Sequence, residues 1–229
     1  MIPLRDDVQS SIAPAISWLI IVLNAFAFMI ELSQGSALNS FISEHGLIPA
    51  DFLGHFGAGQ IVNVFTSMFL HGGFAHIIGN MWFLFIFGDN VEDRMGHIGF
   101  LLFYLITGIC AAMAQVFLSG SSNVPMIGAS GAISGVLGAY FIFYPHATVQ
   151  ALMPMGSFSR IVHVPAGVFL GLWFVMQLVS QFSSALGVED SETGGVAFLA
   201  HLGGFVAGMV LAKVFDKRSG GGNSYGEFA

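Results

Sequence analysis

Long apolar stretches separated by short polar segments dominate the chain. A helix needs about 20 apolar residues to cross the hydrocarbon core of a bilayer. Six stretches approach that length, so each predicts a membrane-spanning helix: residues 14–33, 74–92, 98–118, 127–145, 162–182 and 194–215. The pattern therefore predicts an all-α polytopic membrane protein with one membrane domain over residues 14–215.

The segment between the first two spans is longer than the others. Its apolar character resumes near Ile61, but FLHGGFAH interrupts it, and Gly72 and Gly73 disfavour a helix interior. We therefore start the second span at Phe74 and predict that residues 34–73 form a partly helical connection at the membrane interface. Residues 1–13 form a short N-terminal segment, and the glycine-rich residues 216–229 a flexible tail.

Composition agrees with a membrane location and excludes other classes. The 229 residues are 55% hydrophobic and 8% charged, whereas about a quarter of a soluble domain is charged. Six Lys and Arg residues form no basic patch, so nucleic acid is not an expected partner. The single cysteine, Cys110, cannot form an intrachain disulfide. The first apolar run lacks a basic leader, so we expect it to remain as a span.

The distribution of positive charge predicts the orientation. With six spans, every Lys and Arg falls on one side of the membrane, and the three opposite connections carry only acidic charges. The positive-inside rule then places both termini in the cytoplasm. The six positive residues are Arg5, Arg94, Arg160, Lys213, Lys217 and Arg218.

Four polar residues are predicted at a similar depth below the outer surface. His76 and Asn80 lie on one face at the start of the second span. Ser130 lies about one turn into the fourth span, and His201 about two turns into the sixth. Polar groups inside a membrane are costly, which makes them candidates for function.

These residue types suit acyl transfer. A serine hydroxyl needs a base, which His201 offers to Ser130. A developing oxyanion needs donors, which His76, Asn80 and the Ser130 backbone amide provide. No carboxylate is predicted at this depth, so a Ser-His dyad is favoured over a Ser-His-Asp triad.

Structural alternatives exist for each residue. A serine among small residues is by itself most often a helix-packing residue, and rows of Gly, Ala and Ser in the fourth and sixth spans, including Gly204 and Gly208, allow close helix approach. A lone membrane histidine can instead be a proton relay or a satisfied core residue. Zinc is disfavoured because a metal site usually needs three or more protein ligands. Packing accounts for the glycines but leaves two histidines and an asparagine unexplained.

Three motifs in order, HGGFAHIIGN, GASG and AHLGG, resemble the rhomboid intramembrane serine proteases. The resemblance covers roughly residues 14–215 and includes the six-span count. The segment EDR, from Glu92 to Arg94, is similar to the family's E-x-R motif, for which a structural role in tying helix ends together is expected. "GASG" alone is unspecific, but three motifs on correctly oriented spans are specific.

The resemblance implies a site and an activity. Ser130 would be the nucleophile and His201 the general base, with His76 and Asn80 on the oxyanion side and Gly128 lining the same pocket. Residues 34–73 would be the interfacial L1 loop, with His71 a structural residue. The family cleaves single-pass transmembrane proteins within or near their membrane segment and requires no metal or nucleotide. The expected location is a prokaryotic cytoplasmic membrane, with the site opening to the outer side.

Two positions depart from the family pattern. Four residues after the nucleophile, many members carry an aromatic side chain that stacks on the catalytic histidine, and this chain has Ser134. Phe205 or Tyr140 could support His201 instead. The L1 loop also lacks the Trp-Arg pair of several members and has VNVFTSMF in that region.

Two other functions remain open. An inactive rhomboid-like protein could bind transmembrane clients, although such relatives typically lack the serine or the histidine. A small transporter could use the histidines as a relay, but the two halves of the chain show no clear repeat of the kind transporters often have.

Overall fold

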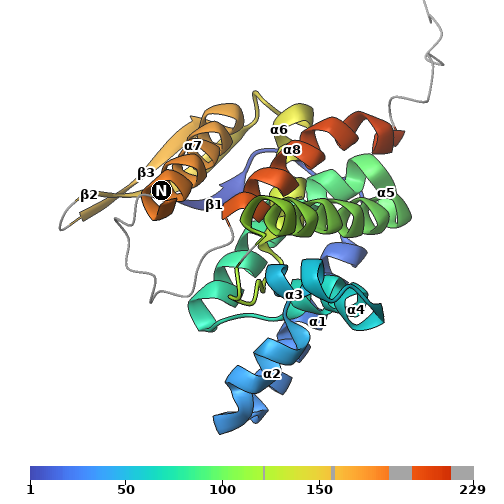
Figure 1. Cartoon of the computed structure of the whole chain (residues 1–229). Coiled ribbons are helices and arrows are strands. Elements are labelled where there is room, and N and C mark those ends of the chain that lie inside the picture. Colours follow the sequence, from blue (N-terminus) through green and yellow to red (C-terminus); the bar gives the residue numbers. More distant parts are fainter. Residues whose placement is uncertain (121, 156–157, 186–197, 218–229) are drawn as a thin grey trace, which may run out of the picture.

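The computed structural model describes residues 1–120, 122–155, 158–185 and 198–217. The protein is mostly helical. Its larger helices are α1 (Ala15–Ser33), α5 (Phe74–Ser119), α6 (Ser130–Phe143), α7 (Ala166–Ala185) and α8 (Phe198–Phe215) (Figure 1). The predicted start of the sixth span at residue 194 and residues 218–229 of the predicted tail lie outside the described residues.

The connection from α1 to α5 consists of short helices. They are η1 (Gly35–Ala37), α2 (Leu38–His45), α3 (Pro49–Gly54), α4 (Ala58–Thr66) and η2 (Ser67–Phe69). Pro49 stands in the first turn of α3, where its missing N–H costs no helical hydrogen bond. This connection ends at Gly73, immediately before α5.

Helix α5 consists of two arms. Gly96 has φ 67° and ψ 163°, a non-helical conformation that interrupts the helix. Glycine tolerates positive φ because it has no Cβ. The arm before Gly96 contains residues 74–92, and the arm after it contains residues 98–118, the two stretches predicted as separate spans.

Within the described part of the chain, three helices are long and apolar enough to cross a membrane: Ala15–Ser33, Phe74–Ser119 and Phe198–Phe215. Two shorter apolar helices accompany them, Ser130–Phe143 and Ala166–Met176. Many large apolar side chains on these helices are exposed, among them Val22, Phe85, Val175 and Val210. A bilayer can cover such surfaces, since lipid tails are apolar.

A three-stranded antiparallel sheet corrects the all-α prediction. It consists of β1 (Ile2–Asp6), β2 (Thr148–Met155) and β3 (Phe158–Pro165), in the order β1-β2-β3. The predicted fifth span began at residue 162, but residues 162–165 belong to β3, and the N-terminal segment contributes β1. Three of the five residues in RIVHV are β-branched, which favours a strand, and α7 begins only after Pro165.

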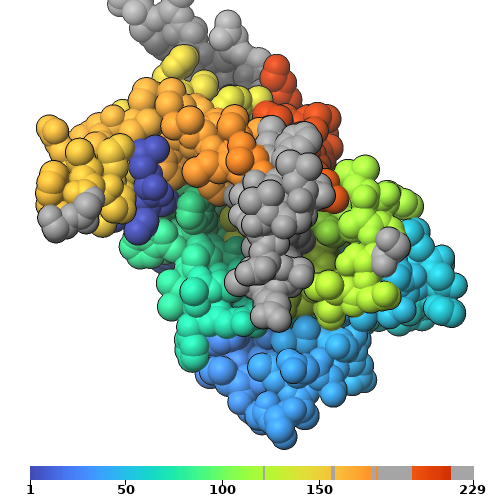
Figure 2. Space-filling model, turned by 60° about the vertical axis from the view of Figure 1, so that its left-hand side comes forward, coloured from blue at the N-terminus to red at the C-terminus, as the bar shows by residue number. Residues whose placement is uncertain are grey.

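Alternate residues of β2 are buried on one face of the sheet. Val149 pairs with Val164 and Ala151 with Val162, and both Val149 and Ala151 are fully buried. In the space-filling view, the gold residues of the hairpin and the dark blue N-terminal residues meet at one edge of the molecule (Figure 2). The sheet therefore joins the N-terminus to the segment between α6 and α7.

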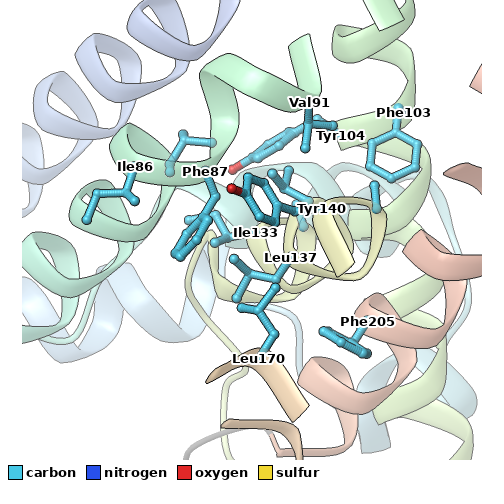
Figure 3. Packing of buried hydrophobic residues seen from close by; sticks show 14 of the residues in the cluster. Ile86, Phe87, Val91, Phe103, Tyr104, Ile133, Leu137, Tyr140, Leu170 and Phe205 are labelled. Atoms are coloured by element: carbon cyan, nitrogen blue, oxygen red, sulfur yellow. The ribbon is translucent and has the colours of Figure 1, made fainter. Parts of the chain in front are cut away.

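The core lies where α5, α6 and α8 meet. Phe87, Ile133, Leu137 and Phe205 are buried there (Figure 3). The backbones of helices α6 and α8 lie in contact with each other. A Cβ added at Gly204 would lie only 2.1 Å from the Gly131 carbonyl oxygen. A Cβ at Gly208 would lie 2.0 Å from the carbonyl oxygen of Gly135. The small-residue rows thus allow these helices to pack closely.

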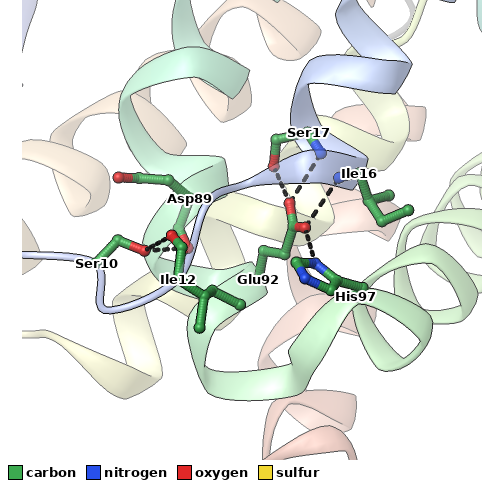
Figure 4. Close-up of polar contacts among 7 residues, drawn as sticks. All are labelled: Ser10, Ile12, Ile16, Ser17, Asp89, Glu92 and His97. Atoms are coloured by element: carbon green, nitrogen blue, oxygen red, sulfur yellow. Dashed lines mark hydrogen bonds and ion pairs between the residues drawn. The ribbon is translucent and has the colours of Figure 1, made fainter.

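Glu92 connects α5 to the start of α1 (Figure 4). Its carboxylate accepts hydrogen bonds from the Ile16 amide (2.9 Å), from the amide and hydroxyl of Ser17 (2.8 Å each) and from Nδ1 of His97 (2.6 Å). The side chain is fully buried. Since the first amides of a helix have no partner within it, Glu92 acts as a cap supplied by another helix.

Arg94 connects α5 to two other helix ends. Its Nε donates to Oδ1 of Asp216 at 3.0 Å, and its Nη2 donates to Oδ2 of the same carboxylate. The guanidinium carbon also lies 4.5 Å from the ring centroid of Phe143, at the end of α6. Glu92 and Arg94 of EDR thus hold different helices, Glu92 holding α1 and Arg94 holding α6 and the segment after α8.

Candidate active site

Ser130 and His201 lie within hydrogen-bond distance although 71 residues separate them. Ser130 begins α6, and His201 lies in the first turn of α8. The distance between Ser130 Oγ and His201 Nε2 is 2.7 Å. With the ring proton on Nδ1, the hydroxyl donates to Nε2. This arrangement allows the imidazole to take the hydroxyl proton as the oxygen attacks a carbonyl.

The small residues of α6 and α8 set this distance. Gly131 follows Ser130 directly, and Gly204 lies one turn after His201. The α-carbon of Gly204 faces the Gly131 carbonyl so closely that no side chain fits between them. The packing of α6 against α8 and the distance between Ser130 and His201 therefore depend on the same glycines.

His76 borders the same site from the first turn of α5. A Cβ built at Gly128 would lie 2.8 Å from His76 Nε2 and 3.4 Å from Ser130 Oγ. Gly128 also has φ +124°, which a residue with a side chain rarely adopts. Its missing side chain thus leaves room between the imidazole and the hydroxyl.

Asn80 follows His76 by one turn and is buried, with 8% of its surface exposed. Its Nδ2 has no hydrogen-bond partner within the described part of the chain. A buried amide without a partner is costly. Asn80 therefore holds a buried donor that the described residues leave without a hydrogen bond.

A small pocket adjoins the serine. Met68, Gly108, Met126, Gly128, Ala200 and Ser130 are among the residues that line it. Apart from the hydroxyl, these side chains are small or apolar, so the pocket suits a small apolar group. Residue Met68 comes from η2, which brings the α1–α5 connection into the site.

Trp173 supplies an aromatic ring next to His201. The two ring centroids are 6.1 Å apart. The centroid of the Phe198 ring lies 6.3 Å from that of His201, and these two rings are arranged edge to face. Centroid distances of 4.5–7 Å are those of interacting aromatic pairs. Sequence reasoning missed Trp173, because it lies on α7 and no motif links it to His201.

The two aromatic residues suggested by the sequence have other contacts. Phe205 stacks on Phe174, with centroids 4.8 Å apart. The Tyr140 hydroxyl donates to the Asp6 carboxylate of β1. Ser134, which stands where many members have an aromatic, donates from Oγ to the Ser130 carbonyl at 2.7 Å. The tryptophan thus takes the place that sequence analysis assigned to Phe205 or Tyr140.

Two further residues near the site were not indicated by any motif in the sequence. Gln115 of α5 accepts a hydrogen bond from the Ala200 amide at 3.2 Å, next to His201. Glu31 of α1 accepts one from the His71 amide. Among the described residues, no group of three or more His, Cys, Asp or Glu side chains could hold a metal ion.

Residues 58–218 match the Rhomboid domain, and the chain belongs to the rhomboid family. With its apolar helices, the protein is therefore an integral membrane protein. The family includes serine proteases as well as inactive rhomboid-like members.

Curated relatives come from plastids, mitochondria and bacteria. Rhomboid-like protein 11, chloroplastic, of Arabidopsis thaliana is 29% identical over 66% of this chain and 51% of its own length. Rhomboid protein 1, mitochondrial, of Saccharomyces cerevisiae is 25% identical over 77% of this chain and 47% of its own. Rhomboid protease GluP of Bacillus subtilis is 27% identical over 87% of this chain and 34% of its own length. The chain thus spans about half the length of these relatives or less.

Proposed function

We propose that this rhomboid-family chain is an intramembrane serine endopeptidase that uses Ser130 as its nucleophile and His201 as its general base. The observation that carries the proposal is the 2.7 Å contact between Ser130 Oγ and His201 Nε2. A nucleophile and base within this distance meet the geometric requirement for covalent acyl transfer. GluP, a relative over most of this chain, is named a protease.

The proposed reaction has two halves. His201 takes the hydroxyl proton of Ser130 while Oγ attacks the scissile carbonyl, and the protonated imidazole then gives that proton to the leaving amine. Water, activated by the same imidazole, hydrolyses the ester formed on Ser130. Peptide hydrolysis of this kind needs no cofactor or metal, and we assign none.

The oxyanion of the tetrahedral intermediate needs hydrogen-bond donors. We assign this role to the side chains of His76 and Asn80 and to the Ser130 amide at the start of α6. Support comes from the space that Gly128 leaves between the imidazole and the hydroxyl, and from the unpartnered Nδ2 of Asn80.

We further propose that the membrane domain over residues 14–215 has six spans, with both termini in the cytoplasm and residues 34–73 as an interfacial L1 loop. The two arms of α5 would be the second and third spans. Exposed apolar side chains in the connection, such as Phe56 and Ile61, suit an interfacial position.

Two pairs of positive residues that lie far apart in the sequence support this topology. Arg5 and Arg160 belong to the same sheet. Arg94 binds Asp216, and the Lys217 side chain lies against Gly96. Arg94 contacts Phe143 at the end of α6, whereas Ser130 begins that helix. If the Arg94 end faces the cytoplasm, Ser130 lies toward the opposite face. The proposed location, a prokaryotic cytoplasmic membrane, follows the resemblance to bacterial members.

The proposed substrates are single-pass transmembrane proteins that reach Ser130 from the bilayer. A small side chain next to the scissile bond would fit the pocket lined by Met68, Met126 and Ala200. The competing function is an inactive rhomboid-like protein that binds such proteins without cleaving them. It is disfavoured because an inactive chain has no need of a serine and histidine in hydrogen-bond contact.

The test is cleavage of a labelled single-pass substrate in proteoliposomes by the wild type and by Ser130→Ala. Cleavage that Ser130→Ala and His201→Ala abolish, with unchanged thermal unfolding, is the expected result. Full cleavage by Ser130→Ala would refute the mechanism. If the wild type cleaves nothing, labelling with a fluorophosphonate decides: labelled Ser130 means an unsuitable substrate, and an unlabelled folded protein favours the inactive client-binding function.

A further inference from the structure

Glu31 is a buried carboxylate whose partner is a distant backbone amide. It lies in the last turn of α1, and 1% of its surface is exposed. Both carboxylate oxygens accept from the His71 amide, at 3.1 and 3.0 Å. Burying a carboxyl group in an apolar bundle is costly, so this contact calls for an explanation beyond packing.

The amide that Glu31 binds begins the turn before α5. The next amide in this turn, that of Gly72, donates to Nδ1 of His76 at 3.3 Å. Gly73, with φ +155°, then accepts from the His76 amide through its carbonyl and starts the helix. Glu31 therefore anchors the turn whose following amide contacts the imidazole of His76.

This contact determines which nitrogen of His76 carries the proton. In a neutral imidazole one nitrogen donates and the other accepts. Nδ1 of His76 accepts from Gly72, so the proton belongs on Nε2. That nitrogen faces the space left by Gly128, 2.8 Å from the point where a Cβ would lie, and Ser130 Oγ is 3.4 Å from the same point.

We propose that Glu31 is a positioning residue that keeps His76 in its Nε2–H tautomer, directed at the oxyanion, by anchoring the turn at residues 71–73. The proposal rests on the proposed protease function for its catalytic consequence, but the tautomer itself does not depend on activity. Without the carboxyl group, the Gly72 amide loses its fixed direction, and the imidazole becomes free to rotate or to exchange tautomers.

The variants separate this role from simple stabilisation of α1. Glu31→Met removes the acceptor while filling the volume, and Glu31→Gln retains an acceptor oxygen for the His71 amide. Ser17→Ala is the matched control, because Ser17 ties the opposite end of α1 to Glu92 through a 2.8 Å hydrogen bond and does not contact the turn. All three variants should lower the unfolding temperature modestly.

The direct measurement is the tautomer of His76 from nitrogen-15 NMR of histidine-labelled protein in detergent, with the His76 signals assigned by their loss in His76→Ala. We expect Nε2–H in the wild type, in Glu31→Gln and in Ser17→Ala, and a mixture in Glu31→Met. Turnover should follow: kcat falls about tenfold in Glu31→Met with little change in KM, since one oxyanion donor is misdirected. Glu31→Gln should restore it.

An Nδ1–H tautomer in the wild type would overturn the proposal, even if Glu31→Met failed to fold. So would a folded Glu31→Met that retains both the Nε2–H tautomer and the wild-type kcat. If the wild type neither cleaves a substrate nor reacts with a fluorophosphonate, the proposed protease function fails, whereas the tautomer measurement still decides the role of Glu31.

Discussion

Gly204 is the residue through which helix packing and the Ser130–His201 contact can be tested together. A Cβ at this position would lie 2.1 Å from the Gly131 carbonyl oxygen, whereas ordinary contacts begin near 3.4 Å. In Gly204→Ala the two backbones must therefore separate by about 1.3 Å, because a backbone carbonyl cannot rotate away as a side chain can.

The expected loss of activity exceeds the loss of stability. Alanine in place of glycine favours a helix by about 1 kcal/mol, and overpacking costs about 1–3 kcal/mol, so the fold should lose at most about 2 kcal/mol. The 2.7 Å contact between Ser130 and His201 would open to about 4 Å, beyond hydrogen-bond distance. Loss of general-base catalysis lowers kcat by about 10²–10⁴-fold.

The assay compares kcat for a transmembrane substrate in proteoliposomes with the unfolding temperature in detergent. Gly171→Ala is the matched control, because a Cβ at Gly171 of α7 would meet no atom within 4 Å. We expect Gly171→Ala to retain both properties. A folded Gly204→Ala with wild-type kcat would refute the conclusion that α6–α8 contact sets the distance between the two side chains.

Two further predictions concern the opposite end of the molecule. Glu92→Ala should lower the free energy of unfolding by about 2–4 kcal/mol, because it leaves buried donors at the start of α1 unsatisfied; denaturation in detergent measures this, and an unchanged midpoint would contradict the capping role. Burial raises the pKa of Asp6 from its ordinary 3.8, although the Tyr140 hydrogen bond opposes the rise. A raised folded-state pKa stabilises the protein at low pH, and this contribution is lost as the pH rises through that value. The stability of the wild type relative to Asp6→Asn should therefore increase as the pH falls from 7 toward 4, and a flat difference would contradict this.

Much of the helical architecture was readable from hydropathy because the bilayer imposes a length and a polarity on each spanning element. The boundary at Phe74 follows from a local signal, the Gly72–Gly73 pair. The same reasoning failed at residues 162–165. There apolar character suggested a span, but pairing with β2 makes these residues a strand, and strand pairing depends on residues far away in the chain.

For the candidate site, the sequence by itself determined which residues to consider, because polar groups within apolar stretches are rare. It led to Ser130, His201, His76 and Asn80 as candidates. Only the tertiary structure decided that Ser130 and His201 lie 2.7 Å apart, that Trp173 lies beside the imidazole, and that Glu31 holds the turn before His76. These contacts join separate helices, and their distances depend on how closely the helix backbones pack, which local pattern and spacing do not specify.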